Sequence, residues 1–174
     1  MDLLPDPLPG QFSLAVLPHG STRQLLQVVA RLALRGSLRV LDGGNRFNAY
    51  TVALALRQHT AGVEAILEQI HVARAFTCYQ VATLLIQTQA IPRPTLVLDM
   101  LATFRDESVS LEERHRLLEA CLSQLRRLAG QAPLLVSVIP QGAQSDELLI
   151  TLEKAADQVW RFGSPAPPLP LRLF

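Results

Sequence analysis

Lysine is almost missing from this chain of 174 residues: of its 16 basic residues, only Lys154 is a lysine. The formal net charge of +1 excludes a strong whole-chain footprint for nucleic acid or an anionic membrane, and it leaves only a local patch open. Arginine is the better bidentate partner for phosphate and carboxylate. A codon bias that leaves solvated arginines on the surface is the simpler explanation of the same composition.

Cysteines and metal-ligand patterns are also scarce. Cys78 and Cys121 fall in apolar helical patterns without CxxC spacing, so we expect buried free thiols in a reducing cytoplasm rather than a disulfide or a zinc site. The four histidines share no metal-ligand spacing with one another or with the cysteines. No GxSxG elbow is present. The sequence therefore predicts no metal site and lacks the common nucleophile motifs.

No apolar run approaches the ~20 residues that a membrane span needs. The start lacks the positive end and long apolar centre of a signal peptide, and its three prolines favour an extended arm over residues 1–11. The Pro-rich residues 164–174 are expected to be a rigid tail, a polyproline ligand or, at 171–174, an edge strand. Residues 12–163 are then one core domain, for which 49% hydrophobic residues are ample.

Short apolar runs alternate with helical periodicity through this core. We expect strands at residues 12–17, 38–41, 70–76, 95–98, 134–139 and 159–162. Helical spacing follows at 21–35, 47–61, 63–68, 78–90, 110–129 and 145–156. Because parallel neighbours require crossover connections, five strand-helix alternations predict an α/β fold with a mostly parallel sheet and helices on both faces.

Polar residues and glycines mark the ends of several of these helices. Ser21 or Thr22 is expected to cap the first helix. Ser110 and Glu113 have capping-box spacing, in which a hydroxyl and a carboxylate each satisfy an end amide. Gly130 is expected to close the helix that follows.

One stretch organises the rest: Leu38–Phe47 runs from an apolar strand into the turn Asp42-Gly-Gly-Asn45 and then into a helix. In open α/β sheets, ligands sit at the strand ends and in the loops that leave them. Phe12–Leu17 and Thr95–Asp99 are expected to end beside this turn. Any chemistry is therefore predicted at this edge of the sheet.

Taken in order, these segments resemble the ATPase core of the RecA/RadA recombinase family, which includes nucleotide-free paralogues and a KaiC-like branch. His71-Val-Ala-Arg-Ala-Phe-Thr77 resembles the third core strand of archaeal and eukaryotic recombinases. Leu41–Phe47 resembles the second strand with its turn, and Leu96–Asp99 resembles the Walker B strand. Residues 122–138 and 156–162 resemble the later helix and strands. The resemblance spans residues 12–163 and implies a RecA-like P-loop NTPase fold.

The phosphate loop departs from the family pattern. A working loop reads GxxxxGK[ST], with glycines that let backbone amides wrap the phosphates and a lysine that reaches the terminal ones. The corresponding Leu17–Arg23 is shorter, keeps only Gly20, and has Ser21 where the lysine should stand. Thr22 could mimic the magnesium-binding hydroxyl, Arg23 could supply charge, and a helix amino terminus attracts anions. The resemblance implies a vestigial phosphate loop with at most weak binding of ATP and magnesium.

The residues for hydrolysis depart as well. In the family, the second strand ends in Asp-Thr-Glu, and the glutamate activates the attacking water. Aligned on Asp42, that position is Gly44. Asn45 is polar but cannot act as a base. Asp99 matches the Walker B carboxylate, although a strand-end carboxylate bonded to helix amides is the simpler interpretation. The resemblance implies vestigial positions at Asp42, Gly44, Asn45 and Asp99, with no catalytic residue, and favours a chain that is not an enzyme.

The DNA-gripping loops of recombinases are reduced here. They correspond to Met100–Val109 and Pro140–Gln144, both short. The first offers Arg105 against Asp106 and Glu107, and the second has no positive charge. Neither loop resembles a groove that follows a phosphate backbone.

Two functions remain open. The first is a non-catalytic RecA/RadA-like module in the cytoplasm that binds a protein partner, such as a recombinase paralogue, with DNA as part of that complex, in recombination or repair. The second is a nucleotide-binding ATPase or KaiC-like regulator with an atypical phosphate loop. A homodimer is the base-rate expectation for its assembly. No membrane partner is expected.

Overall fold

Short apolar runs become six strands in the computed structural model, which describes residues 7–141 and 146–163. The strands are β1 (Phe12–Val16), β2 (Leu38–Asp42), β3 (Ile70–Arg74), β4 (Thr95–Leu98), β5 (Leu134–Val138) and β6 (Gln158–Arg161). The strands β1, β4 and β5 are buried on both faces, which is why they read as continuous apolar runs in the sequence.

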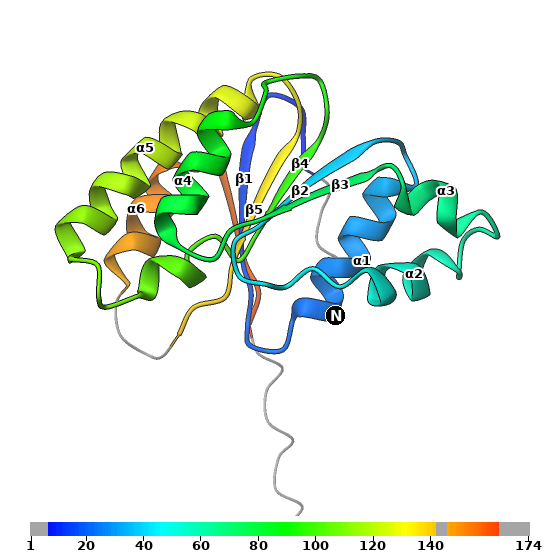
Figure 1. Ribbon diagram of the computed structural model, residues 1–174, viewed down its shortest axis with the longest axis horizontal. Helices are drawn as coiled ribbons and strands as arrows, with labels where there is room; N and C mark the ends of the chain where they lie inside the picture. Colours follow the sequence, from blue (N-terminus) through cyan, green and yellow to red (C-terminus); the bar gives the residue numbers. More distant parts are fainter. Residues whose placement is uncertain (1–6, 142–145, 164–174) are drawn as a thin grey trace, which may run out of the picture.

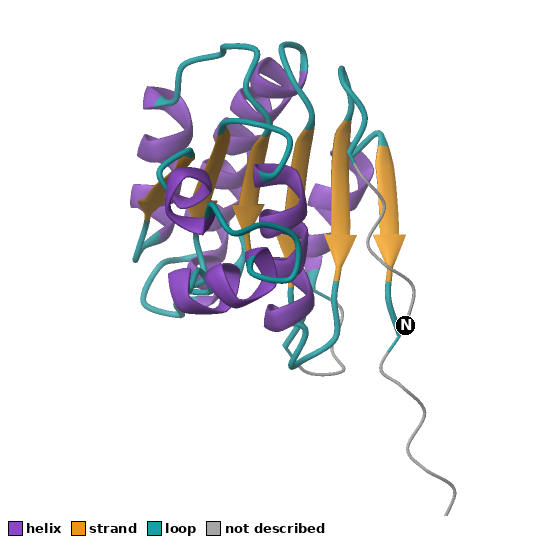
Figure 2. Ribbon diagram, turned by 90° about the vertical axis from the view of Figure 1, so that its right-hand side faces the viewer, coloured by secondary structure: helices purple, strands orange, loops and turns teal. Residues whose placement is uncertain are grey.

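Helices follow the strands wherever apolar residues recur at helical spacing. They are α1 (Thr22–Ala33), α2 (Ala49–Leu56), α3 (Val63–Leu67), α4 (Cys78–Gln87), α5 (Leu111–Ala129), α6 (Glu147–Ala155) and the 3-10 turn η1 (Ala102–Arg105). Figure 1 shows α4, α5 and α6 on one side of the sheet and α1, α2 and α3 on the other. Figure 2 shows the strands side by side, with helices in front of and behind them.

The strand order is β3-β2-β4-β5-β1-β6, and every neighbouring pair is parallel. The predicted α/β fold with a mostly parallel sheet and helices on both faces is confirmed, and the described strands are parallel without exception. The arrangement is consistent with a RecA-like P-loop fold. Because the strands are parallel, their carboxyl ends meet along one edge, where β2 ends at Asp42 and β4 leads into Asp99.

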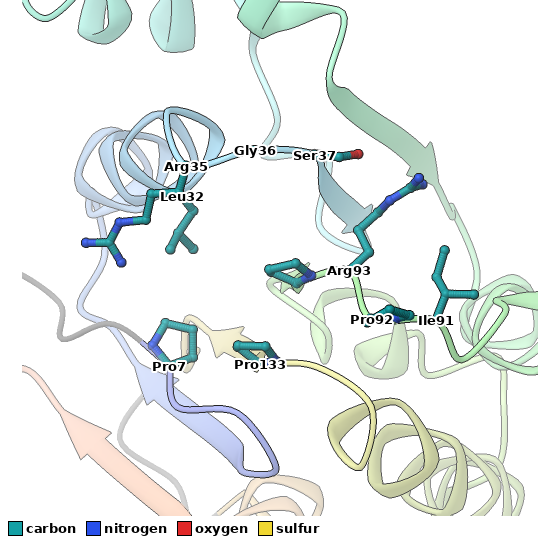
Figure 3. Close-up of a pocket in the computed structure, with 10 residues that line it drawn as sticks. Pro7, Leu32, Arg35, Gly36, Ser37, Ile91, Pro92, Arg93 and Pro133 are labelled. Atoms are coloured by element: carbon teal, nitrogen blue, oxygen red, sulfur yellow. The ribbon is translucent and has the colours of Figure 1, made fainter.

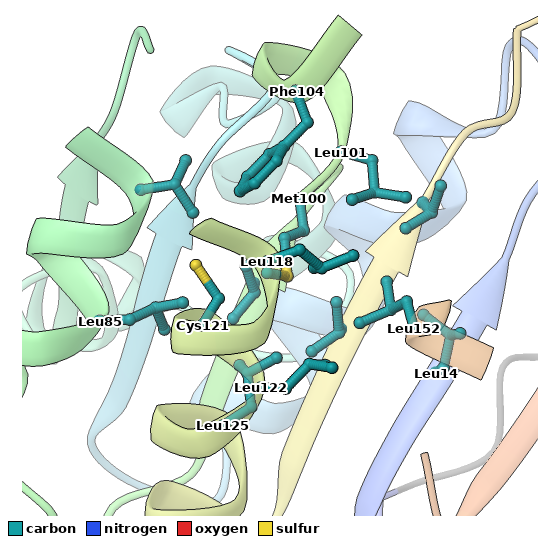
Figure 4. Packing of buried hydrophobic residues seen from close by; sticks show 14 of the residues in the cluster. Leu14, Leu85, Met100, Leu101, Phe104, Leu118, Cys121, Leu122, Leu125 and Leu152 are labelled. Carbon is teal, nitrogen blue, oxygen red and sulfur yellow. The ribbon is translucent and has the colours of Figure 1, made fainter. Parts of the chain in front are cut away.

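Two apolar layers hold the helices to the sheet, because successive strand residues point to opposite faces. Leu14 and Val136 belong to the layer shared with α4, α5 and α6, whereas Ala15 and Leu135 belong to the layer shared with α1, α2 and α3. Figure 4 shows the first layer, in which the inward side of α5 meets side chains from the sheet and from η1. Because the side chains within the strands pack on both faces of the sheet, the residues at the strand ends form its edge.

Local hydrogen bonds move two helix boundaries from their predicted positions. The side chain of Asn48 accepts from the backbone N–H of Thr51, so α2 begins at Ala49 rather than at Phe47. The predicted helix over 78–90 ends at Gln87, because Thr88 is extended and its hydroxyl donates to the carbonyl oxygen of Leu84. Both corrections come from side-chain bonds that apolar spacing does not register.

The predicted caps are only partly formed. Ser110 Oγ accepts from the N–H of Glu113 at 3.2 Å, but the Glu113 carboxylate receives Nε and Nη2 of Arg116 instead of returning the bond. The capping box is therefore half made. Ser21 occupies the N-cap position of α1 without a side-chain capping bond, and Gly130 closes α5 in the ordinary helical conformation.

Among the helices in the described ranges, none combines the length and the apolar character required to cross a bilayer. The predicted edge strand at 171–174 and the predicted helix start at Ser145 lie outside the described residues. Within them, α6 begins at Glu147, and its N-cap Asp146 accepts from the N–H groups of Leu148 and Leu149.

Candidate functional site

Two buried carboxylates stand at the carboxyl edge of the sheet. Asp42 is the last residue of β2, Asp99 follows β4, and both have no exposed surface. Because β2 and β4 are hydrogen-bonded neighbours, the two side chains lie close together at the edge where ligands bind in open α/β folds. Burying two charged groups is costly unless each is paired and hydrogen-bonded. Their partners therefore decide what this site can do.

Asp99 is paired with Arg46, which lies in the loop after β2. Its Oδ2 receives Nε and Nη2 of Arg46 at 2.9 and 2.8 Å, and its Oδ1 receives the N–H of Ile139 at 3.0 Å. Its own N–H donates to Ser137 Oγ at 2.9 Å. The sequence favoured a strand-end carboxylate bonded to helix amides, and this prediction was wrong about the partners. Among the described residues, the Asp99 side chain bonds to a guanidinium and to a strand-end amide. In a Walker B strand this carboxylate would face magnesium through water, whereas here the Arg46 guanidinium supplies the positive charge beside it.

The backbone of Asp99 is in the left-handed region, with φ at +46°. This conformation is costly for a residue other than glycine and persists only where surrounding contacts enforce it. The bonds from Arg46, Ile139 and Ser137 are those contacts. The carboxylate is thus held rigidly against β5.

Asp42 organises the loop that carries Arg46. Its Oδ1 accepts from the N–H of Arg46 at 2.8 Å, and its Oδ2 accepts from the N–H of Phe47 at 2.9 Å and from Arg74 Nε at 3.0 Å. Arg74 also donates from Nη2 to the carbonyl oxygen of Phe47 at 3.0 Å. The loop after β2 is therefore wrapped around Asp42, which positions Arg46 to reach Asp99.

Gly44 passes against Asp99 with no room for a side chain. A Cβ built on Gly44 would lie 2.5 Å from Asp99 Cβ and 2.9 Å from its Oδ2. The neighbouring Asn45 is exposed and has φ at +55°. In the recombinase family that the sequence resembles, this position carries the water-activating glutamate. Here the backbone of Gly44 lies against the Asp99 carboxylate and leaves no space for such a side chain.

The predicted phosphate-loop residues lie at the same edge but apart from the carboxylates. Gly20 has φ at +83°, which glycine adopts without strain. Ser21 is buried, Thr22 begins α1 and Arg23 is exposed. Within the described ranges, no hydrogen bond or ion pair joins these four residues to Asp42 or Asp99. The structure therefore brings Asp42, Gly44 and Asp99 together and leaves residues 20–23 separate.

Sequence reasoning missed the two arginines that complete this site. A buried carboxylate requires a cation, and two candidates were visible. Arg46 follows Asp42 by four residues, and Arg74 ends the neighbouring strand in register with Asp42. Both arginines could have been found from the rule that two strand-end carboxylates in an apolar sheet need two nearby cations.

A cavity of about 420 Å³ opens beside this site, lined by residues 43–45, 75–76, 102–103 and 105–106. Asp42 and Asp99 are not part of its wall. The predicted free thiols of Cys78 and Cys121 are confirmed, and both are buried. Burial raises the pKa of Cys78, and burial with the adjacent Cys78 raises the pKa of Cys121 to about 12, so neither thiol is a ready nucleophile.

The part of the chain that the structure describes contains no group of three His, Cys, Asp or Glu residues arranged to hold a metal ion. The site thus consists of two carboxylates, two arginines and one glycine, with every charge neutralised inside the protein. No protein-family model matches the chain and no curated protein matches it, so the function of the site is argued from its geometry.

Proposed function

We propose that this chain is a non-catalytic RecA/RadA-like module whose surfaces bind a protein partner. It acts as an accessory in DNA recombination or repair. The observation that carries the proposal is the pairing of Arg46 with Asp99. In a phosphoryl-transfer site, a metal ion neutralises the negative charge of the carboxylates and of the substrate phosphate. Here the guanidinium of Arg46 is the cation beside Asp99.

The other departures point the same way. Gly44 cannot accept a proton, and its close approach to Asp99 leaves no space for a carboxylate side chain at that position. Ser21 stands where the phosphate-binding lysine would be. Two buried free thiols suit a reducing compartment, and the proposal places the module in the cytoplasm.

The open edge of β3 is the surface that we assign to a protein partner. Ala75 N donates to Asp42 O and Leu38 N donates to Gln69 O, so the odd-numbered residues of β3 bond to β2. In a parallel strand, the alternate residues direct both backbone groups to the other side. The N–H and C=O groups of Val72 therefore face away from the sheet, as do those of its even-numbered neighbours.

Exposed apolar side chains lie on β3 and directly after it. Val72 is 40% exposed and Phe76 is 67% exposed. An unpaired strand with apolar flanks favours the addition of a strand from another chain. The proposed occupant is an extended apolar segment of a different protein.

A thermal-shift measurement with magnesium-ATP tests the loss of nucleotide chemistry. We expect magnesium-ATP to give no rise in Tm that depends on the phosphate loop, because a loop that does not bind the nucleotide in the native state cannot contribute to stabilisation. The variant Arg23→Gln is measured in parallel. A Tm rise that this variant abolishes would overturn the proposal, because the nucleotide would then be bound at the phosphate loop.

A charge placed on the open edge tests the partner surface. We expect Val72→Lys to lose the proteins that the immobilised wild-type chain retains from a cell extract, because a charged side chain on an edge strand opposes strand addition. Leu54→Lys, on the exposed side of α2, is the matched control and should retain them. If Val72→Lys retains the same proteins, the edge of β3 is not the binding surface. Self-association that Val72→Lys abolishes would instead identify a second copy as the occupant.

The second candidate, a nucleotide-binding regulator with an atypical phosphate loop, is favoured by one feature. The amino terminus of α1 has no acidic residue in its first turn and follows the left-handed Gly20. Free backbone N–H groups there attract anions through the helix dipole. The same thermal-shift measurement separates the two functions.

A further inference from the structure

Three arginines gather at the amino end of the sheet, on the edge opposite the paired carboxylates. Arg39 lies near the start of β2, Arg93 lies in the loop before β4, and Arg127 lies near the end of α5. Arg39 and Arg127 meet at the end of α4: Arg39 Nη1 donates to Gln89 O at 3.0 Å, and Arg127 Nη2 donates to Thr88 O at 2.7 Å. The Arg39 N–H donates to the carbonyl oxygen of Pro94 at 3.0 Å, which brings the adjacent Arg93 to the same end of β2. Burial lowers the pKa of Arg39, and the charges of Arg93 and Arg127 lower it further, in agreement with this placement.

No carboxylate in the described part of the chain forms an ion pair with any of the three. This contrasts with the other edge, where Arg46 and Arg74 each have an aspartate. The last carbonyls of α4 supply about half a negative charge, so most of the positive charge is uncompensated. His71 is in register with Arg39 on the neighbouring strand and therefore projects on the same face of the sheet.

Arg93 differs from the other two arginines because its side chain has no bonding partner among the described residues. Its side chain makes no hydrogen bond to residues 7–141 or 146–163, so none of its five guanidinium donors is used by this part of the chain. It belongs to the wall of a cavity of about 550 Å³, which Pro92, Pro94 and Pro133 also line. In Figure 3 the Arg93 side chain extends from this wall away from the cavity, on the side of Ser37. Arg39 and Arg127 bond to carbonyl oxygens in the last turn of α4 and just after it, whereas Arg93 has no such bond among the described residues.

We propose that Arg39, Arg93 and Arg127 form a binding site for a phosphate group. Phosphate carries up to two negative charges and several acceptor oxygens, which lets it bridge three guanidinium groups. A single carboxylate has two oxygens in one plane and matches one guanidinium fork. The phosphate has two chemical sources, a small phosphorylated compound or the backbone of a nucleic acid, and the charge cluster recognises the feature that they share.

The site is independent of the proposed function, because it lies at the other edge of the sheet from Asp42 and Asp99. Nucleotide stabilisation through this cluster would persist in Arg23→Gln and disappear in Arg93→Gln. The two proposals can therefore fail separately.

The test uses the full chain with two probes, inorganic phosphate at constant ionic strength and a labelled single-stranded oligonucleotide. We expect phosphate to raise the Tm of the wild type and of Arg57→Gln, an exposed arginine at the end of α2, but not of Arg93→Gln. If the oligonucleotide also binds, Arg93→Gln should weaken it about tenfold and reduce the slope of log K against log salt by about 0.7. Circular dichroism checks that Arg93→Gln is folded.

Each possible result either supports the phosphate site or overturns it. Stabilisation by phosphate alone, lost in Arg93→Gln, supports a small phosphorylated ligand. Oligonucleotide binding that phosphate competes away, and that Arg93→Gln weakens, supports a nucleic-acid backbone. No effect of either probe, or equal effects on Arg93→Gln and wild type, overturns the site. Binding of polyglutamate through Arg93 without any response to phosphate also overturns it, because the cluster would then recognise acidic peptides.

Discussion

Replacing Arg46 by alanine is expected to destabilise the protein by about 3 kcal/mol, because it leaves Asp99 as a buried charge without a cation. Asp99 has no exposed surface, whereas the Arg46 side chain is 34% exposed, so the low end of the range for buried pairs applies. For a chain of this length, the loss corresponds to a fall in Tm of about 6–12 °C. Denaturant unfolding monitored by circular dichroism measures it.

Two further variants separate the ion pair from general effects of the substitution. Arg57→Ala removes an exposed arginine and should change the free energy of unfolding by less than about 0.5 kcal/mol. In Arg46→Ala with Asp99→Asn, no charge is left unpaired, and we expect at least about 1 kcal/mol of the loss to be recovered relative to the sum of the single variants. Additive losses would show that Arg46 does not neutralise Asp99, and Arg46 would then not take the place of a metal ion at this site.

The sequence predicts the layers of this fold because each strand is a short apolar run between glycines, prolines and helical spacing. Thr95–Leu98 has the predicted bounds, and Leu134–Val138 differs from its prediction by one residue. Parallel order follows from the crossovers that the alternation imposes. These features are local or depend only on the order of elements, so a single sequence contains them.

The candidate site is less visible in the sequence because its contacts are distant along the chain. Arg46 and Asp99 are 53 residues apart, and Arg74 and Asp42 are 32 apart. Spacing rules cannot show that Arg46 turns back onto β4. The resemblance identified Asp42, Gly44 and Asp99 as positions of interest, but the arginines came only from the coordinates.

Competition between partners explains why only half of the predicted capping box is formed. Glu113 could bond the Ser110 amide or the Arg116 guanidinium, and it takes the latter with two contacts at 2.7 Å. Arg116 in turn holds the pKa of the Glu113 carboxyl below its usual range. The exposed pair adds little stability, yet it decides the direction of the side chain.

Gly44→Glu, which restores the glutamate of the resembling family, is expected to destabilise the chain by at least about 3 kcal/mol and to give no ATP hydrolysis. Its Cβ would lie 2.5 Å from Asp99 Cβ, a separation that requires the loop or Asp99 to move. Overpacking of this kind costs about 1–3 kcal/mol for small additions, and the new carboxylate adds repulsion beside Asp99. Denaturant unfolding gives the stability, and phosphate release gives the activity.

Gly44→Ala and Gly130→Ala distinguish steric overlap from the loss of glycine itself. Gly44→Ala keeps the overlap without a charge and should lose about 2 kcal/mol. Gly130 is helical, and a Cβ there would meet backbone oxygens at 3.6 Å, so Gly130→Ala should be neutral or slightly stabilising. If Gly44→Glu were instead as stable as the wild type and hydrolysed ATP, the site would lack only one carboxylate, and the proposal of a non-catalytic module would have to rest on that single residue. Since the overlap is with Asp99 itself, a proton acceptor at residue 44 and the Arg46–Asp99 pair exclude one another.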